Sequence, residues 1–348
     1  MASTSDNRPT AGWVGIDISK AFFDVALWGD QPFNGMTLSR FPRSEEGATA
    51  FVEWLQHQSR DVAGLTMEWT GNYSRELAEW LQRLRPDWPI SLVNPALVRS
   101  FGKSYGLRNK TDQVDARLLA LYGQERKPQG WLKPEQEQDQ LRSLFRTRAK
   151  LEKILVSLRC RKEDCLNPAQ AVKVAQAAVI EALATQIKAL EKAGRDLMRS
   201  YPRMKQDLDL LLSIPGVGPI TAMAVMAEAG DLRRFRRGRQ LTAFLGVSPR
   251  RNQSGTSVHG RTRMCRIGGK FIRPVLYMSA VSTTARKGPM GEFYRSLVGR
   301  GKAGRAAIGA VMRKMLLVMR AVLIQNAPYH YPLSPQTNDS QTPKARPA

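Results

Sequence analysis

Alternating apolar and polar positions near the start of the chain predict a β-sheet. Every second residue from Val14 to Ile18 is apolar, with Gly15 and Asp17 between them, which is the periodicity of a strand with one buried face. The short gap before the next apolar run predicts a hairpin. Further strands are expected at Phe22–Trp28, Met36–Phe41, Leu65–Trp69 and Ile90–Val93.

Apolar residues at helical spacing separate the later strands. One helix is expected over Glu45–His57, a second carries the apolar stripe from Leu77 to Leu84, and a third covers Asp112–Tyr122. Strands followed by alternating helices and strands are typical of a mixed sheet covered by helices. Residues 13–129 are therefore predicted to form an α/β domain.

Leucine and isoleucine residues at three- and four-residue spacing predict long helices over residues 130–203. Arg148 interrupts the first of the two apolar stripes. The pattern fits either an antiparallel helical hairpin or a dimerising coiled coil. Residues 204–327 are predicted to form a mostly α-helical, basic domain. Two polar segments at the ends of the chain are expected to be disordered, 1–12 and 328–348.

The excess of basic residues in the chain predicts a polyanionic partner. Its 348 residues carry 54 Lys and Arg against 30 Asp and Glu, a formal net charge of +24. From Arg233 to Arg273 there are eleven Arg and one Lys, without an Asp or Glu. Nucleic acid is the expected partner of such a surface, and a solubility patch is the alternative. The stretch lacks an amphipathic helix with an aromatic face, which argues against a membrane surface.

Hydropathy and cysteine usage predict where the protein resides. No run of eighteen apolar residues is present, and residues 1–10 lack the apolar stretch of a secretory signal. Cys160, Cys165 and Cys265 have neither the number of a disulfide framework nor the paired spacing of a zinc site. We therefore expect a cytoplasmic protein with reduced thiols and no membrane partner.

Four acids stand where a metal-dependent site would need them. Asp17 lies within an apolar strand, where a carboxylate is costly unless a cation or hydrogen-bond donors accompany it. Glu68 lies near the end of another strand, and ligand sites of open α/β sheets lie beyond strand ends. Asp112 and Asp115 are three residues apart and share one helix face. These hard oxygen ligands suit Mg²⁺ or Mn²⁺, and a pair of such ions promotes phosphoryl transfer.

Each acid taken alone has another interpretation. Asp112 and Asp115 have the spacing of a capping box at a helix start, and Glu68 fits the polar face of a strand. Asp17 is the hardest to explain without a function. The order of strand Asp, strand Glu and helical Asp-x-x-Asp favours one joint metal site.

A glycine-rich turn at Ile214–Pro219 precedes an apolar helix and resembles a helix-hairpin-helix element. Gly216 and Gly218 would expose backbone N–H groups at a helix start, where a DNA phosphate binds well. A tight turn between packed helices is the alternative. Nucleic-acid contacts are further predicted for the arginines Arg233, Arg234, Arg236, Arg237, Arg250, Arg251, Arg261, Arg263 and Arg266.

Several segments resemble the insertion-sequence 110 family of transposases, the DEDD transposases, which are related to the invertases of pilin genes. The resemblance covers about residues 13–327, and all four acids match the metal-site positions of the family. The segments that carry it are Gly15–Lys20, Met67–Gly71, Val93–Pro95, Lys110–Ala116 and Ala243–Ser257.

The resemblance implies a RuvC-like amino-terminal domain, similar to the Holliday-junction resolvases of the ribonuclease H superfold. It also implies that Ser254 is a nucleophile that leaves a 5′-phosphoserine link to DNA. Ser257 is the rival nucleophile in the same loop, and no base is identified for either serine. The acids and the serine would meet in a composite site of a dimer or tetramer. That assembly would act on donor and target DNA under the guidance of an RNA encoded by the element.

Two functions of other classes stay open at this point. A junction-resolving endonuclease would use the four acids and water, without Ser254 and without a covalent intermediate. A non-enzymatic nucleic-acid-binding protein would carry the acids as helix caps and surface residues and would not depend on divalent metal. A DNA transposase or site-specific recombinase of a mobile element accounts for the acids and the basic region together.

Overall fold

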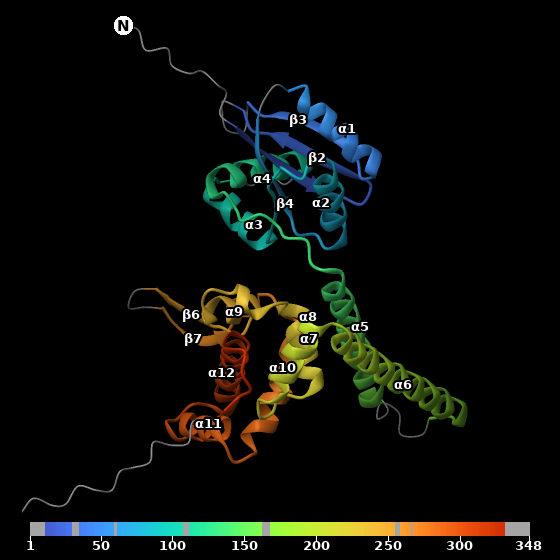
Figure 1. Ribbon diagram of the computed structural model, residues 1–348, viewed down its shortest axis with the longest axis vertical. Helices are drawn as coiled ribbons and strands as arrows, with labels where there is room; N and C mark the ends of the chain where they lie inside the picture. The colour runs from blue at the N-terminus through green and yellow to red at the C-terminus, as the bar shows by residue number, and fades with distance from the viewer. Residues whose placement is uncertain are drawn as a thin grey trace, which may run out of the picture. The chain divides into compact units, whose positions relative to one another are not determined.

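The computed structural model divides the chain into two compact units, Met1–Lys133 and Pro134–Ala348 (Figure 1). The predictions of disorder fall mostly on residues 1–10 and 331–348, which lie outside the described residues. Residues 251–254 and 258–263 are described by their backbone alone. The described residues are 11–29, 35–58, 61–106, 111–161, 168–254, 258–265 and 267–330.

A five-stranded mixed sheet forms the centre of the first unit. Its strands are β1 (Gly12–Ile18), β2 (Phe22–Leu27), β3 (Thr37–Pro42), β4 (Val62–Glu68) and β5 (Ile90–Val93). Their order across the sheet is β3-β2-β1-β4-β5. The pairs β1–β2 and β2–β3 are antiparallel, whereas β1–β4 and β4–β5 are parallel. The predicted mixed sheet and its first hairpin are confirmed.

Helices cover both faces of this sheet. They are α1 (Glu45–Gln56), α2 (Asn72–Leu84), α3 (Pro95–Ser104) and α4 (Asp112–Arg126). Phe51 of α1 and Leu81 of α2 belong to one buried cluster with Ile16 of β1. Phe101 of α3 and Leu119 of α4 belong to another, which lies on the opposite face. The first unit therefore has three layers, with the sheet between two pairs of helices (Figure 1).

Gly15 allows α4 to lie directly on β1. A Cβ atom at Gly15 would stand 2.0 Å from the carbonyl oxygen of Ala116 and 2.2 Å from the amide nitrogen of Ala120. Residues two apart on a strand share a face, so Asp17 lies on the face that α4 covers. This close approach brings the first turn of α4 near the carboxylate of Asp17.

Two long helices open the second unit. They are α5 (Gln136–Arg161) and α6 (Gln170–Ser200), and they pack against each other. Arg148, the residue that interrupts the apolar stripe of α5, forms an ion pair of 2.9 Å with Glu191 of α6. The two helices thus form a hairpin within the chain, whereas dimerisation through them stays a prediction.

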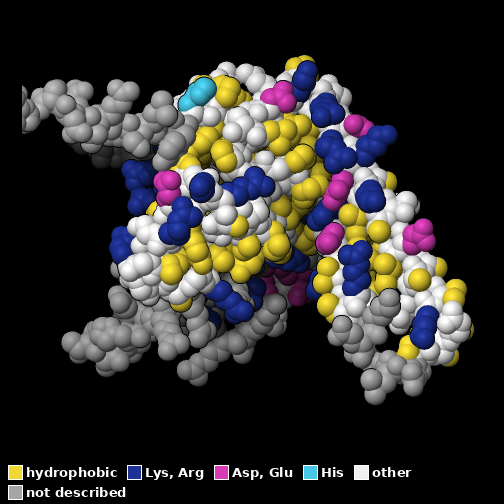
Figure 2. All heavy atoms as spheres, turned by 90° about the horizontal axis from the view of Figure 1, so that it is seen from below, with side chains coloured by type: hydrophobic (Ala, Val, Ile, Leu, Met, Phe, Trp, Pro, Cys, Tyr) yellow, Lys and Arg dark blue, Asp and Glu magenta, His cyan; other side chains and the backbone are white. Residues whose placement is uncertain are grey.

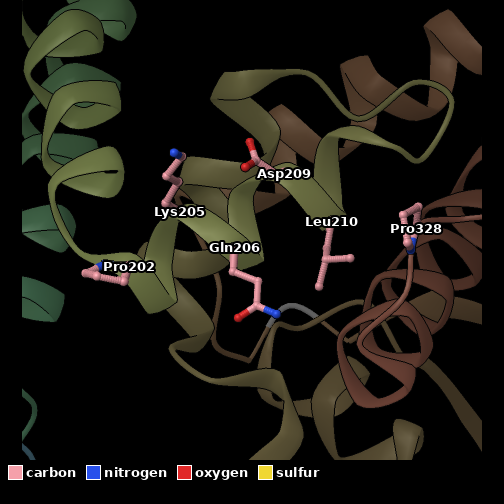
Figure 3. Close-up of a pocket in the computed structure, with 6 residues that line it drawn as sticks. All are labelled: Pro202, Lys205, Gln206, Asp209, Leu210 and Pro328. Atoms are coloured by element: carbon pink, nitrogen blue, oxygen red, sulfur yellow. The ribbon is translucent and has the colours of Figure 1, made fainter.

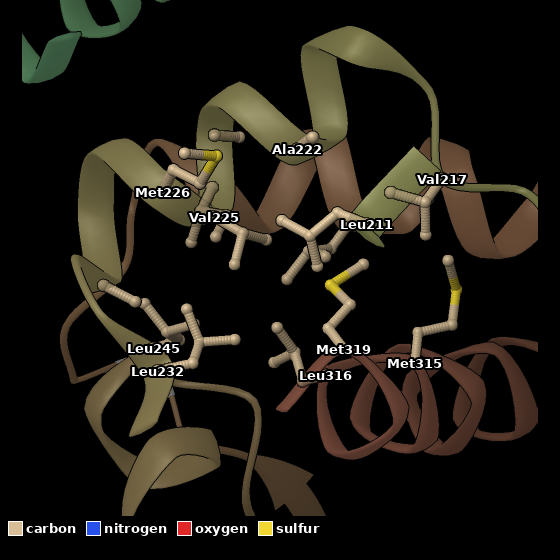
Figure 4. Packing of buried hydrophobic residues seen from close by; sticks show 14 of the residues in the cluster. Leu211, Val217, Ala222, Val225, Met226, Leu232, Leu245, Met315, Leu316 and Met319 are labelled. Atoms are coloured by element: carbon tan, nitrogen blue, oxygen red, sulfur yellow. The ribbon is translucent and has the colours of Figure 1, made fainter. Parts of the chain in front are cut away.

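One buried core joins this hairpin to the other helices of the second unit. Phe145 of α5 and Met198 of α6 belong to the same cluster as Leu211, Val225 and Met319, and part of that cluster is drawn in Figure 4. The remaining helices are α7 (Pro202–Leu212), α8 (Pro219–Ala229), the 3-10 turn η1 (Leu232–Arg234), α9 (Gly238–Phe244), α10 (Ile272–Thr284), α11 (Pro289–Gly299) and α12 (Gly304–Gln325).

Polar side chains of α5 also hold the carboxyl end of α8. Gln138 and Arg142 donate hydrogen bonds to carbonyl oxygens of the last turn of α8. Arg146 forms two hydrogen bonds, of 2.7 and 2.9 Å, with the buried carboxylate of Glu228. Because helix ends leave carbonyl groups without partners inside the helix, these contacts make α5 a structural part of the second unit.

A β-hairpin interrupts the helices where the sequence predicts a loop inside a mostly helical domain. The strands β6 (Pro249–Ser254) and β7 (Val258–Met264) pair antiparallel, with Ser254 opposite Val258. These strands are rich in arginine and lack the apolar alternation that reveals a half-buried strand. The prediction was wrong at this point for that reason, and the other elements of the second unit are helices.

Candidate active site

Asp17 and Glu68 lie on adjacent parallel strands at the same edge of the sheet. The register of β1 and β4 pairs Ile16 with Met67, so the residues that follow them, Asp17 and Glu68, are neighbours. Glu68 is the last residue of β4. The ends of parallel strands are the usual place for ligands in open α/β sheets, and the structure brings these two acids together there.

The first turn of α4 contributes Asp112 and Asp115. The residue that caps the helix is Thr111, whose hydroxyl accepts a hydrogen bond of 3.3 Å from the amide of Val114. The alternative in which Asp112 is the cap is therefore wrong, because the preceding residue takes that position. Carboxylates in a first turn also interact favourably with the helix dipole, so this placement alone does not assign them a role.

Negative charge from the other three acids reaches Asp17. The pKa of Asp17 is raised from its ordinary value of 3.8 to about 6, and burial is the main cause. The charges of Asp115, Asp112 and Glu68, in this order, contribute to the same rise. The four predicted acids therefore form one electrostatic cluster, and their repulsion contributes to the raised pKa of Asp17.

A divalent cation would relieve this repulsion. Carboxylate oxygens are the ligands that Mg²⁺ and Mn²⁺ prefer, so the chemistry of the cluster fits such an ion. Within the described parts of the chain, no three Asp, Glu, His or Cys side chains are grouped closely enough to hold one metal ion. Binding therefore requires the acidic side chains to turn toward a common point.

Asp24 of β2 and Arg40 of β3 also border the cluster, and periodicity alone missed them. Asp24 lies opposite Asp17 in the β1–β2 register and is only 4% exposed. Arg40 donates a hydrogen bond of 2.9 Å to each of its carboxylate oxygens. The Nη2 atom of Arg40 also lies 3.4 Å from Oδ2 of Asp112. The available signal was a lone acid in an apolar strand, which is the signal that identified Asp17.

The glycine-rich turn joins α7 to α8, and its two glycines differ. Gly216 has a φ of +87°, and a Cβ atom there would stand 1.7 Å from the side chain of Thr283 in α10. Packing between helices therefore explains Gly216. A Cβ atom at Gly218 would meet no described atom within 4 Å. Gly218 directly precedes α8, so it is the glycine that leaves this helix start accessible.

Arg233 is engaged inside the second unit. Its guanidinium donates hydrogen bonds of 2.7 and 3.0 Å to the carboxylate of Asp207 and one of 2.9 Å to the carbonyl oxygen of Leu323. Asp207 is only 8% exposed, and a buried carboxylate needs such a partner. Arg233 thus has a structural role whether or not it also contacts nucleic acid.

The other predicted arginines occupy varied positions. Arg234 lies over the rings of Phe235 and Phe244. Of the rest, Arg236, Arg237 and Arg250 are exposed, Arg251 lies in β6, Arg261 and Arg263 lie in β7, and Arg266 lies outside the described residues.

Ser254 is the last residue of β6, at the end of the β6–β7 hairpin. Its backbone is described, and its rival Ser257 lies outside the described residues.

Two cavities in the described part of the second unit are lined by residues other than the predicted site residues. A hollow of about 600 Å³ lies between α5 and α6. A smaller hollow of about 370 Å³ (Figure 3) is lined by Pro202, Lys205, Gln206, Asp209, Leu210 and Pro328.

On the face drawn in Figure 2, Lys and Arg side chains are more widespread than Asp and Glu. No helix among the described residues has the length and apolar character needed to cross a membrane.

Comparison with known proteins relates both units to one group. A family model described as "Transposase IS116/IS110/IS902 family" matches residues 208–295, and a DEDD model described as "Transposase" matches residues 14–169. The pilin gene-inverting protein of Moraxella bovis is 30% identical over 320 residues, which cover 91% of this chain and 97% of that protein. The chain belongs to the IS116/IS110/IS902 family of transposases.

Membership makes this transposase an enzyme of DNA recombination. The transposase for insertion sequence element IS1111A of Coxiella burnetii is 28% identical over 193 residues, 48% of this chain and 52% of that protein. The match over 14–169 contains all four acids, and the match over 208–295 contains Ser254. The alternative of a non-enzymatic binding protein is thereby excluded.

Proposed function

We propose that the transposase cuts and rejoins DNA with the four acids of the first unit and with Ser254 of the second. The observation that carries the proposal is the cluster around Asp17, where three further carboxylates raise the pKa of this one. The mixed sheet order β3-β2-β1-β4-β5, with helices on both faces, supports a RuvC-like domain of the ribonuclease H superfold.

The acids are proposed to hold Mg²⁺ or Mn²⁺. When bound, such an ion stabilises negative charge that develops on the oxygens of a phosphate under attack. The protein's part is to bring Glu68 of β4 and the first turn of α4 to Asp17, and the close packing at Gly15 supports this arrangement. Asp17 must be ionised to act as a ligand, so binding displaces its proton.

Ser254 is proposed to be the nucleophile. Its hydroxyl oxygen forms a bond to phosphorus as the bond from phosphorus to the 3′ oxygen breaks. The serine gives up its proton, and the 3′ oxygen leaves as a hydroxyl group. The resulting 5′-phosphoserine link keeps the free energy of the phosphodiester, so attack by a 3′-hydroxyl rejoins a strand without ATP. The position of Ser254 at a hairpin end and within the family match supports this role.

Donor DNA, target DNA and a guide RNA from the same element are the proposed partners. Net charge of +24 supports the binding of several polyanions at once. A dimer or tetramer is proposed because exchange joins several strands in one complex. We also propose that the enzyme acts in the cytoplasm, on the bacterial nucleoid.

The test is a single gel. The full chain is incubated with end-labelled cognate DNA, its RNA and Mg²⁺, then denatured. We expect a protein–DNA adduct with the unaltered chain and with Ser257→Ala, and no adduct with Ser254→Ala or Asp17→Asn. Ser254→Ala should still bind DNA, because one hydroxyl contributes little to an affinity that phosphate contacts dominate.

Each other pattern selects a different mechanism. Cleavage without any adduct, unaffected by Ser254→Ala, would favour an endonuclease that uses the four acids and water. An adduct that persists in Ser254→Ala and disappears in Ser257→Ala would move the nucleophile to Ser257. Full cleavage by Asp17→Asn in Mg²⁺ would contradict the metal site itself.

A further inference from the structure

We propose that Arg40 is a positioning residue of the acidic cluster, which keeps the fifth carboxylate, Asp24, out of the metal site and holds Asp112 within reach of it. The inference rests on the proposed metal site. It concerns which carboxylates are available to the ion, and it adds two residues of β2 and β3 to the site.

The strand register places Asp24 where a metal ligand would be expected. Asp17 of β1 and Asp24 of β2 are directly opposite each other, and residues paired in this way present their side chains on the same face. The neighbour two residues along, Ala26, packs in the buried cluster under α4. Asp24 therefore lies on the face that also carries Asp17, Glu68 and the start of α4.

Arg40 occupies both oxygens of this carboxylate. It is paired with Asp24 in the β2–β3 register, and its Nε and Nη2 atoms donate to Oδ1 and Oδ2 at 2.9 Å each. The carboxylate of Asp24 is buried, whereas half of the Arg40 side chain is exposed. A planar guanidinium that binds a carboxylate through two parallel hydrogen bonds is the strongest form of this pair. Asp24 cannot turn the two lone pairs that face Arg40 toward an ion without breaking this pair.

The same guanidinium reaches one of the four acids. Nη2 of Arg40 lies 3.4 Å from Oδ2 of Asp112, and its guanidinium carbon lies 5.9 Å from the centre of the Phe22 ring. Asp112 lies in the first turn of α4, outside the strands of the sheet. Arg40 thus links β2, β3 and α4 at the point where the acids gather.

This arrangement predicts that loss of Arg40 and loss of the Asp24 charge shift the affinity for divalent ions in opposite directions. Without Arg40, Asp24 becomes an unpaired carboxylate beside Asp17 and adds one negative charge to the cluster, so divalent ions bind more tightly but in the wrong position. Without the charge of Asp24, Arg40 has only Asp112 to neutralise and competes with the ion for it. If the pair had a purely structural role, loss of either partner would lower the stability of the fold. The two losses would then not shift the affinity for divalent ions in opposite directions.

The test measures Mn²⁺ binding to the full chain by calorimetry, without DNA. We expect Arg40→Gln to lower the Kd for Mn²⁺ about fivefold and Asp24→Asn to raise it about fivefold, because one unit charge is added to or unmasked beside a divalent ion. The double variant, Asp24→Asn with Arg40→Gln, should return to within about twofold of the unaltered Kd. It leaves no lone buried charge, so it also serves if Arg40→Gln fails to fold. Arg40→Lys keeps the charge but loses the two parallel hydrogen bonds to Asp24, so its Kd should lie between those of Arg40→Gln and the unaltered chain.

Strand cleavage in Mg²⁺ provides the second readout. Arg40→Gln should cleave at least about tenfold more slowly despite its tighter ion binding. Shifts of both single variants in the same direction, or no shift in either, would overturn the role of Arg40 while Asp17→Asn still abolishes Mn²⁺ binding. Mn²⁺ binding by Asp17→Asn equal to that of the unaltered chain would overturn the proposed metal site and this inference with it.

Discussion

The two units of the molecule differ sharply in charge. Residues 1–133 contain 16 Lys and Arg against 15 Asp and Glu, whereas residues 134–348 contain 38 against 15. The net positive charge of the chain therefore resides almost entirely in the second unit. Because phosphate contacts dominate nucleic-acid affinity, binding is expected to depend mainly on the second unit.

The nearly neutral first unit gathers acids at one edge of its sheet. The negative charges around Asp17 contribute to its raised pKa, and the same charges are expected to repel a phosphate until a cation is bound. The second unit attracts phosphate without any ion. On the proposed mechanism the metal site lies in the first unit, whereas most of the charge that would bind phosphate lies in the second. Mutations should therefore separate the loss of metal-dependent cleavage from the loss of nucleic-acid affinity.

Asp17→Asn is expected to have the largest effect. Loss of groups that merely support metal ligands costs about 10- to 100-fold, so loss of a direct ligand should slow cleavage by more than about a hundredfold. DNA affinity, measured by gel shift, should change less than about twofold, since no phosphate contact is removed. Glu53→Gln, an exposed acid of α1, is the matched control and should cleave normally. Equal losses of cleavage and DNA affinity in Asp17→Asn would contradict a role of the acids in cleavage alone.

Gly15→Ala is expected to disturb the acids through the fold. The added Cβ atom would meet backbone of α4 at 2.0 Å, and backbone cannot turn aside as a side chain can. We expect a loss of about 3 kcal/mol in the free energy of unfolding, measured by urea denaturation. Gly130→Ala, where the nearest atom would be at 3.9 Å, should cost far less. Unchanged stability in Gly15→Ala would contradict the close packing of α4 on β1.

Two arginine variants sharpen the comparison inside the basic stretch. The double variant Arg236→Gln and Arg237→Gln should reduce the slope of log K against log salt by about two units, since each phosphate contact contributes close to one. Its melting temperature should stay unchanged, because both side chains are exposed. Arg233→Gln should instead cost on the order of 2 kcal/mol of stability by leaving the buried Asp207 unpaired. If Arg233→Gln instead reduced the salt slope and the double variant lowered stability, Arg233 would be the phosphate contact and Arg236 and Arg237 the structural residues.

The stability of the metal-free protein should depend on the ionisation of Asp17. Its pKa is about 6 in the folded chain against 3.8 ordinarily, so the folded state holds the proton more tightly. Ionisation therefore costs stability, and the loss grows as pH rises from about 4 to about 6 and is complete above that range. Asp17→Asn, measured by thermal denaturation, should be more stable than the unaltered chain at pH 7 by about 1 to 2 kcal/mol, allowing for solvent screening. No difference at pH 7 in metal-free buffer would contradict the raised pKa of Asp17.

Local patterns predicted most of the first unit, because apolar runs mark its strands and helical spacing of apolar residues marks α1 and α2. The helix α3 was missed for a different reason. Asn94 and Pro95 directly follow the strand Ile90–Val93 and fit its end, but they also begin a helix, in which the Asn94 side chain accepts a hydrogen bond from the amide of Ala96. The same two residues serve both purposes, and only the residues that follow decide between them.

The sequence by itself determined the candidate acids, since a carboxylate inside an apolar strand and an Asp-x-x-Asp spacing are local properties of the chain. It also determined the basic character of the second unit. Tertiary structure alone decided which charges meet. The β1–β4 register and the approach of α4 at Gly15 bring Glu68 and the first turn of α4 to Asp17. Arg40 and Arg233 acquire their carboxylate partners from other elements. Such pairing depends on burial and on contacts between distant segments, which no local pattern of residues encodes.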